Sequence, residues 1–445
     1  MPATIGAMNN RHFRLDVSLL LIVAVIATAC GSSTITPTPP TATTPQPSIG
    51  TAPSASPTGL SSPALSTPNS ATDQATYAQI ESEVENLRQL MPKLAVTPVL
   101  LDEKGVRDWV TKATETGVDH AALAAQSRLF AHMGLLPAGA SLEQLELDLT
   151  SGQAIGFYDP DTKQLYLLSQ SGAVGAEQKL TFSHEFTHAL QDQNFGLGKL
   201  AIDTVDQGDR DLAHTALPEG DATLSMYQWA TAHMSALDLG SAILSSGSGT
   251  QTDQLNHAPA VLREDLLFPY VDGLAFVEGI YAQGGWASVD KLYAKPPSST
   301  SQILHPDLYA KGVNPVGLTL SAVPAAAGKG WKLSMQDTMG ELQLRVWLEG
   351  EHPTADQKTA ADAAASTWAG DRIGLYEGPG GTWAVVLRTQ WRSSAGRTDF
   401  AAAATKTLDG LTAPSLICGD AVHADIVIAS DQATMGAFAT CKVGE

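Results

Sequence analysis

Two histidines and a glutamate in one short segment have the spacing of a metal-dependent hydrolase. His184 and His188 are four residues apart, so on an α-helix their imidazoles would lie on one face and reach a single metal ion. Glu185 would lie about 100° further round that helix, where it could take a proton from the attacking water. The pattern His-Glu-x-x-His predicts one catalytic Zn²⁺ held by the two histidines, with Glu185 as general base. The alternative is a pair of helix-surface histidines beside a solvated glutamate.

The neighbouring residues favour the helix that this spacing requires. Gly175 precedes the segment, Gly196 follows it, and no proline lies between them. Phe182, Phe186 and Leu190 recur at helical spacing on the side away from the histidines. We therefore expect a helix that buries its apolar side in a core and presents the histidines to a cleft.

A catalytic zinc site uses three protein ligands, so a third residue must complete the set. We select Glu219, within Glu-Gly-Asp-Ala, where a helix is expected to begin and where small neighbours permit close helix packing. His214 and Asp192 are the competing ligands. The helix dipole alone would favour a carboxylate at a helix start, so the selection of Glu219 depends on the histidine pair.

Four further residues are candidates for supporting roles. Hydrolysis needs a donor for the oxyanion of the transition state, and His305 or Tyr309 could supply it. The alternative is a structural loop in which His305 bonds the backbone. Asp192 and Asp221 could orient the ligand histidines by accepting their remaining N–H groups.

The N-terminal region has the features of an export signal followed by a tether. Residues 1–30 contain Arg11 and Arg14, then an apolar stretch too short for a comfortable membrane span. Small residues directly before Cys30 resemble a bacterial lipobox, which predicts lipidation of Cys30 and an anchor on the outer face of a bacterial cell membrane. An ordinary cleaved signal peptide or a retained anchor is the alternative. Residues 31–72 are rich in Thr, Pro and Ser and predict a disordered tether.

The net charge argues against one class of partner, and the three cysteines have two expected roles. The formal net charge of −20 argues against nucleic-acid binding, because nothing would neutralise the phosphates. Of three cysteines, Cys30 would carry lipid. The remaining two, Cys418 and Cys441, most simply form one disulfide in an exported protein.

Three motifs resemble a known family. They are His184 to Asp192, Glu219 to Ala222, and Pro296 to Tyr309. Together they resemble the gluzincin clan of zinc metallopeptidases, and more closely its poorly characterised bacterial secreted and lipoprotein members. The resemblance implies that His184, His188 and Glu219 bind zinc and that Glu185 is the catalytic base.

The resemblance covers about residues 73–312 and extends more weakly beyond them. Two departures stand out. Ser301 occupies a position where the family usually has Glu, and Pro218 replaces an aliphatic residue before the ligand Glu219.

The expected fold class is α+β. A mostly helical zincin-like catalytic domain over 73–312 would carry a β-hairpin, 155–158 with 164–168, before the metal helix. A C-terminal α+β lobe would follow over 313–445. Further expected elements are a strand over 94–101, helices over 103–116, 119–133, 141–149, 203–216, 217–233, 260–295, 338–350, 354–368 and 397–408, a loop over 240–252, and strands over 315–323, 382–391 and 424–429.

These observations predict a membrane-anchored extracytoplasmic zinc peptidase that cleaves a peptide or protein substrate. Two alternatives remain open. One is a non-catalytic binding lipoprotein with a structural or vestigial metal site. The other is a zinc hydrolase of a non-protein substrate, such as a cell-wall cross-link.

Overall fold

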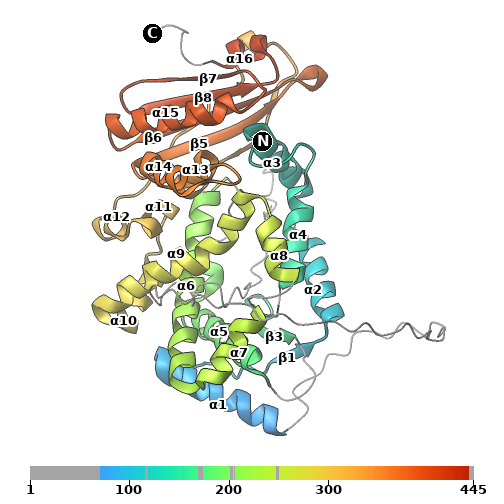
Figure 1. The fold of residues 1–445 in the computed structure, drawn as a ribbon, viewed down its shortest axis with the longest axis vertical. Helices are drawn as coiled ribbons and strands as arrows, with labels where there is room; N and C mark the ends of the chain where they lie inside the picture. Colours follow the sequence, from blue (N-terminus) through green and yellow to red (C-terminus); the bar gives the residue numbers. More distant parts are fainter. Residues whose placement is uncertain are drawn as a thin grey trace, which may run out of the picture.

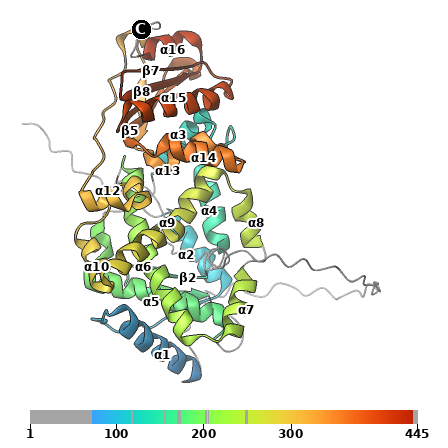
Figure 2. The same ribbon diagram turned by 60° about the vertical axis from the view of Figure 1, so that its left-hand side comes forward.

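The chain forms a mostly helical part and a C-terminal lobe stacked along the long axis of the molecule (Figure 1, Figure 2). The computed structural model describes residues 71–115, 119–153, 155–168, 174–200, 204, 206–246 and 250–439. The expected signal segment, Cys30, the tether as far as residue 70 and Cys441 lie outside the described residues. No helix of the described ranges meets the length and hydropathy of a membrane span.

The helical part contains twelve α-helices within the described ranges. They are α1 (Ala71–Arg88), α2 (Glu103–Glu115), α3 (His120–Met133), α4 (Leu142–Gln153), α5 (Ala176–Phe195), α6 (Gly208–His233), α7 (Ala236–Ser246), α8 (Thr250–His257), α9 (Ala260–Gly284), α10 (Trp286–Asp290), α11 (Thr300–Leu304) and α12 (Pro306–Lys311). The loop expected over 240–252 is wrong, because α7 and α8 occupy most of it.

A small three-stranded sheet precedes the metal helix. Strands β2 (Gly156–Asp159) and β3 (Gln164–Leu168) pair antiparallel as a hairpin, which confirms the sequence prediction. Strand β1 (Val99–Leu101), shorter than expected, joins parallel to β3, so the order is β1-β3-β2. Helix α5 follows the hairpin and packs against both of its strands.

Helix α5 begins and ends where its flanking glycines predicted. Gly175 is the N-cap and Gly196, with φ of 77°, is the left-handed C-cap. Phe182, Phe186 and Leu190 are buried together with residues of α1 in one hydrophobic cluster. The opposite side of α5 carries the histidines and is also buried, so both faces of this helix are covered.

Helix α6 differs from the expectation. The sequence predicted two helices with Glu219 at the start of the second, whereas α6 runs unbroken from Gly208 to His233 with Pro218 inside it. A proline inside a helix removes one backbone hydrogen bond and is normally costly. The side chain of Gln191 in α5 donates to the Pro218 carbonyl at 3.0 Å, which ties this part of α6 to α5. Glu219 is therefore not a helix-start residue.

Helices α6 and α9 cross with their backbones in contact. A Cβ atom on Gly220 would lie 2.3 Å from the carbonyl oxygen of Gly273, and one on Gly273 would lie 2.5 Å from that of Ala216. The expectation that small residues beside Glu219 permit close helix packing is confirmed. The crossing therefore holds α9 against the turn of α6 that carries Glu219.

The C-terminal lobe is a five-stranded antiparallel sheet with helices, which confirms the α+β fold class. The order is β4-β5-β6-β8-β7. Its elements are β4 (Lys332–Asp337), α13 (Gly340–Glu349), α14 (Ala355–Ala365), β5 (Trp368–Glu377), β6 (Trp383–Trp391), α15 (Ser394–Asp409), β7 (Ser415–Gly419), β8 (His423–Ala429) and α16 (Gln432–Phe438).

The two parts share one hydrophobic core. A single cluster of buried side chains includes Leu129 of α3 and Ile428 of β8. Trp347 of α13 donates its indole N–H to the carbonyl of Met133 at 3.0 Å. The segment 313–324, where a strand was expected, has neither helix nor strand. It contacts β5 through a hydrogen bond from the Val316 amide to the Ala369 carbonyl.

Candidate metal centre

Three side chains from α5 and α6 converge on one buried point. His184 Nε2 and His188 Nε2 lie 3.1 and 3.4 Å from Glu219 Oε2, and the two nitrogens are 3.0 Å apart. All three residues are buried, and they form the group of the described chain that could hold a metal ion. The sequence-based choice of these three residues as neighbours agrees with this geometry.

The donor set fits a zinc ion. In a tetrahedral site with Zn–N and Zn–O distances of about 2.0–2.1 Å, ligand atoms are roughly 3.3 Å apart. The three separations of 3.0, 3.1 and 3.4 Å are close to that value. Two imidazoles and one carboxylate leave a fourth position, which is the composition of catalytic rather than structural zinc sites.

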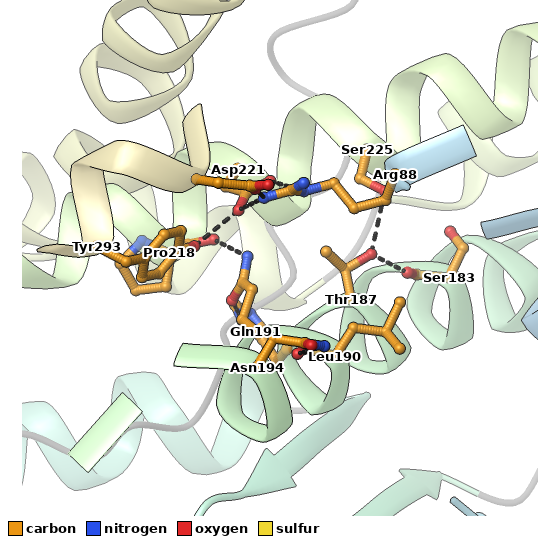
Figure 3. Close-up of polar contacts among 12 residues, drawn as sticks. Arg88, Ser183, Thr187, Leu190, Gln191, Asn194, Pro218, Asp221, Ser225 and Tyr293 are labelled. Atoms are coloured by element: carbon orange, nitrogen blue, oxygen red, sulfur yellow. Dashed lines mark hydrogen bonds and ion pairs between the residues drawn. The ribbon is translucent and has the colours of Figure 1, made fainter. Parts of the chain in front are cut away.

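Gln191 fixes which nitrogen of His188 faces the site. Its Oε1 lies 2.8 Å from His188 Nδ1. Its Nε2 donates to the Pro218 carbonyl (Figure 3). Because the Nε2 of Gln191 donates to the Pro218 carbonyl, it is the Oε1 that lies against His188, where it accepts a hydrogen bond from Nδ1–H. When His188 is neutral, as a metal ligand must be, its lone pair is thereby placed on Nε2, toward His184 and Glu219. Sequence reasoning missed Gln191, although its position three residues after His188 on one helix face was a usable signal.

The three residues perturb one another electrostatically. Burial by itself would raise the pKa of Glu219, but the adjacent His188 and His184 hold it down at about 2. Burial would lower the pKa of His188, but Glu219 and Glu185 raise it to about 9. Burial lowers the pKa of His184, against the opposing effect of Glu219. Glu219 is therefore anionic, and the two imidazoles compete to balance its charge.

Glu185 lies beside this group and is 0% exposed. Its carboxylate is one of the groups that raise the pKa of His188, after Glu219. It is not one of the three converging ligands. Glu185 is thus a buried carboxylate in the helix that carries both histidines, outside the group that could hold a metal ion.

The ring of Tyr270 in α9 lies near that of His184, a contact that sequence reasoning missed. Its ring centroid is 6.3 Å from that of His184, with an interplanar angle of 33°. The close crossing of α9 on α6 brings it there. Its position in the sequence, far from the other site residues, gave no signal of this proximity.

His305 and Tyr309 have other partners. His305 Nε2 lies 2.6 Å from Glu341 Oε1 of α13, and this hydrogen bond raises the pKa of His305. Tyr309 donates to the Lys295 carbonyl at 2.7 Å. Both contacts belong to the segment that joins the helical part to the C-terminal lobe. The neighbouring Ser301 likewise accepts a hydrogen bond from Arg392 of that lobe at 2.7 Å.

Asp192 and Asp221 do not accept hydrogen bonds from the ligand histidines in the contacts that the structure shows. Asp192 accepts from Tyr158 at 2.9 Å and from Lys163 at 2.6 Å. Asp221 is held by Arg88 and Tyr293. The orienting role expected of these aspartates is filled at His188 by Gln191. The competing ligand His214 contacts the carbonyl of Leu200 through Nδ1.

Comparison with known proteins adds a single match. A family model described as a domain of unknown function (DUF8575) matches residues 332–442, which span the C-terminal lobe from β4 to beyond α16. No curated protein matches the chain. No solved structure matches it either.

Proposed function

We propose that this protein is a zinc-dependent peptidase, with His184, His188 and Glu219 as metal ligands and Glu185 as general base. The observation that carries the proposal is the buried convergence of the three ligand atoms within 3.0–3.4 Å of one another, beside a second buried carboxylate, that of Glu185. A structural site closes its coordination with four protein ligands and needs no base. The arrangement therefore favours catalysis over a binding lipoprotein with a structural metal.

The chemistry follows from the positions of the chain's own residues. When bound, zinc acts as a Lewis acid and lowers the pKa of a coordinated water to about 7. Glu185 accepts the proton of the attacking water and delivers it to the leaving amine. Gln191 keeps the Nδ1–H of His188 directed away from the metal position. Tyr270, whose ring lies near that of His184, is our candidate donor to the developing oxyanion in place of His305 and Tyr309.

The test compares the full-length chain with its Glu185→Gln variant. Both are loaded with zinc and incubated with a diverse peptide library. The wild type is expected to release products that a chelator abolishes, whereas Glu185→Gln binds zinc equally well and loses roughly 10²–10⁴-fold in turnover. Near wild-type turnover in Glu185→Gln would sink the assignment of the base. Zinc binding without products from either protein would favour the binding-lipoprotein or cell-wall cross-link alternatives.

The cellular setting belongs to the same proposal. Lipidation of Cys30 would attach the protein to the outer face of a bacterial membrane, and residues 31–72 would hold the catalytic part away from it. A Cys418–Cys441 disulfide would tie the C-terminus to β7. Incorporation of a labelled fatty acid that Cys30→Ala abolishes is the expected result. Label retained in Cys30→Ala would contradict the anchor.

A further inference from the structure

A buried arginine binds a side chain of α6, the helix that supplies the carboxylate ligand. Arg88, the last residue of α1, is 0% exposed. Its Nε and Nη2 lie 2.7 and 2.9 Å from the two carboxylate oxygens of Asp221 in α6. Nη2 also contacts Asp290 at 2.8 Å, and the guanidinium lies 4.3 Å above the ring of Trp286. Figure 3 shows Arg88 bound to Asp221, with Tyr293 donating to Asp221 as well.

Asp221, the residue that Arg88 binds, is two positions after the proposed metal ligand Glu219. Asp221 and Glu219 are about 200° apart around α6, so they point to different sides of the helix. Glu219 faces the histidines of α5, while Asp221 faces Arg88 and Tyr293. Gln191 of α5 holds the Pro218 carbonyl one residue before Glu219. The turn that carries the carboxylate ligand is thus fixed from both sides.

We propose that Arg88 is a positioning residue for the metal centre, which sets the place and rotation of the α6 turn that presents Glu219. This rests on the proposed metal site, but not on the reaction that the site performs. A bidentate arginine–carboxylate contact has fixed planar geometry, so it resists both rotation and sliding of the helix it holds. The helix that carries Arg88 also packs against α5, which carries the two histidines. Helix α1 therefore holds both ligand-bearing helices in register.

The alternative is that Arg88 contributes only to stability. Burying a guanidinium requires charge partners, and Asp221 and Asp290 would meet that need wherever they stood. The two roles differ in what a folded variant would do. If Arg88 only stabilises the fold, a variant that still folds should bind metal normally. If Arg88 positions Glu219, the metal geometry should change even when the fold survives.

The test uses the full chain with Arg88→Met and Arg88→Lys, and Arg128→Met as matched control. Arg128 makes a similar two-nitrogen contact with Glu377 of β5 in the C-terminal lobe, although this pair is partly exposed. Zinc affinity is measured by chelator competition, and the visible spectrum of the Co²⁺-loaded protein reports the coordination geometry. We expect Arg88→Met to weaken zinc binding by roughly 10–100-fold and to alter the Co²⁺ spectrum. Arg88→Lys should restore part of the loss, and Arg128→Met should match the wild type.

A double variant keeps the test decisive if Arg88→Met does not fold. Arg88→Met with Asp221→Leu replaces the buried ion pair by apolar side chains, a change that often preserves folding. Reduced zinc affinity in this folded variant supports the proposal. Wild-type affinity and an unchanged Co²⁺ spectrum, in either folded variant, would overturn it. Metal binding is read directly, so a protein that binds zinc and cleaves no peptide would refute the peptidase without affecting this inference.

Discussion

Adding one methyl group to Gly220 should separate α6 from α9 and disturb the metal centre. The new Cβ would lie 2.3 Å from the carbonyl oxygen of Gly273 and 2.8 Å from the backbone nitrogen of Leu274. Non-bonded contacts need about 3.3 Å or more, so the helices would have to part by roughly 1 Å. Because both partners are backbone atoms, no side-chain rotation relieves the overlap. The change would displace the turn that carries Glu219.

The magnitude follows from two opposing terms. Overpacking of this kind costs about 1–3 kcal/mol, and backbone contact places this site at the upper end. Replacing glycine by alanine inside a helix returns about 1 kcal/mol. We therefore expect Gly220→Ala to lower the free energy of unfolding by about 2 kcal/mol. A ligand displaced by a large fraction of 1 Å should also weaken zinc binding at least tenfold, since metal–ligand distances tolerate only about 0.2 Å.

Denaturant unfolding and chelator competition measure the two effects separately. Gly279→Ala, on the partner helix α9, is the control, because a Cβ there would meet nothing within 4 Å. That variant should be as stable as the wild type or more so, by up to about 1 kcal/mol, with unchanged zinc affinity. If Gly220→Ala behaves like Gly279→Ala in both assays, the backbone contact does not control the site and the reasoning is refuted.

Three further predictions concern the metal and the junction between the two parts. Gln191→Leu should weaken zinc binding roughly 10–100-fold in chelator competition, because His188 loses its orienting partner; unchanged affinity would contradict the role of Gln191. Removing zinc with a chelator should lower the free energy of unfolding by about 4 kcal/mol, relative to the protein in zinc at 1,000 times its Kd. Calorimetry measures this difference, and equal stability with and without zinc would contradict metal binding. Burial raises the pKa of Asp209 to about 7 and that of Asp371 to about 6, so the folded state binds protons that the unfolded state has released. The contribution of these two carboxyl groups to the stability of the metal-free protein should therefore fall by several kcal/mol from pH 5 to pH 7.5, because each tenfold difference in proton affinity between the folded and unfolded states corresponds to about 1.4 kcal/mol. Asp209→Asn should flatten that slope in denaturant titrations at each pH, and an unchanged slope would contradict the role of Asp209.

The sequence predicted the elements whose signals are local. Helix α5 follows from its flanking glycines and apolar spacing, and the β2–β3 hairpin from a proline-containing turn between apolar runs. The ligand triad followed because four-residue spacing fixes two histidines on one helix face, and small residues beside Glu219 marked a close helix crossing. Each of these inferences needs only a few consecutive residues.

Elements that depend on distant contacts were missed or misplaced. The sequence placed a helix start near Pro218, but packing on both sides of α6 keeps one helix through this residue. Strand β5 was not predicted, because Gly370, Asp371 and Arg372 interrupt the pattern of apolar residues that is typical of a strand. The strand is formed by pairing with β4 and β6 on its two sides. Gln191 and Tyr270 reach the metal centre only through the packing of α5, α6 and α9. Pairwise proximity between helices is the information that one sequence does not carry.

The shared core has a consequence for how the protein is made. Arg128 pairs with Glu377 across 249 positions, Trp347 bonds Met133 across 214, and Arg88 reaches Asp290 across 202. Contacts of such long range form late, because loop closure must precede them. A chain synthesised from its N-terminus would hold the histidine helix long before the residues that complete its surroundings exist. Premature termination should therefore yield an aggregation-prone fragment rather than a smaller folded protein.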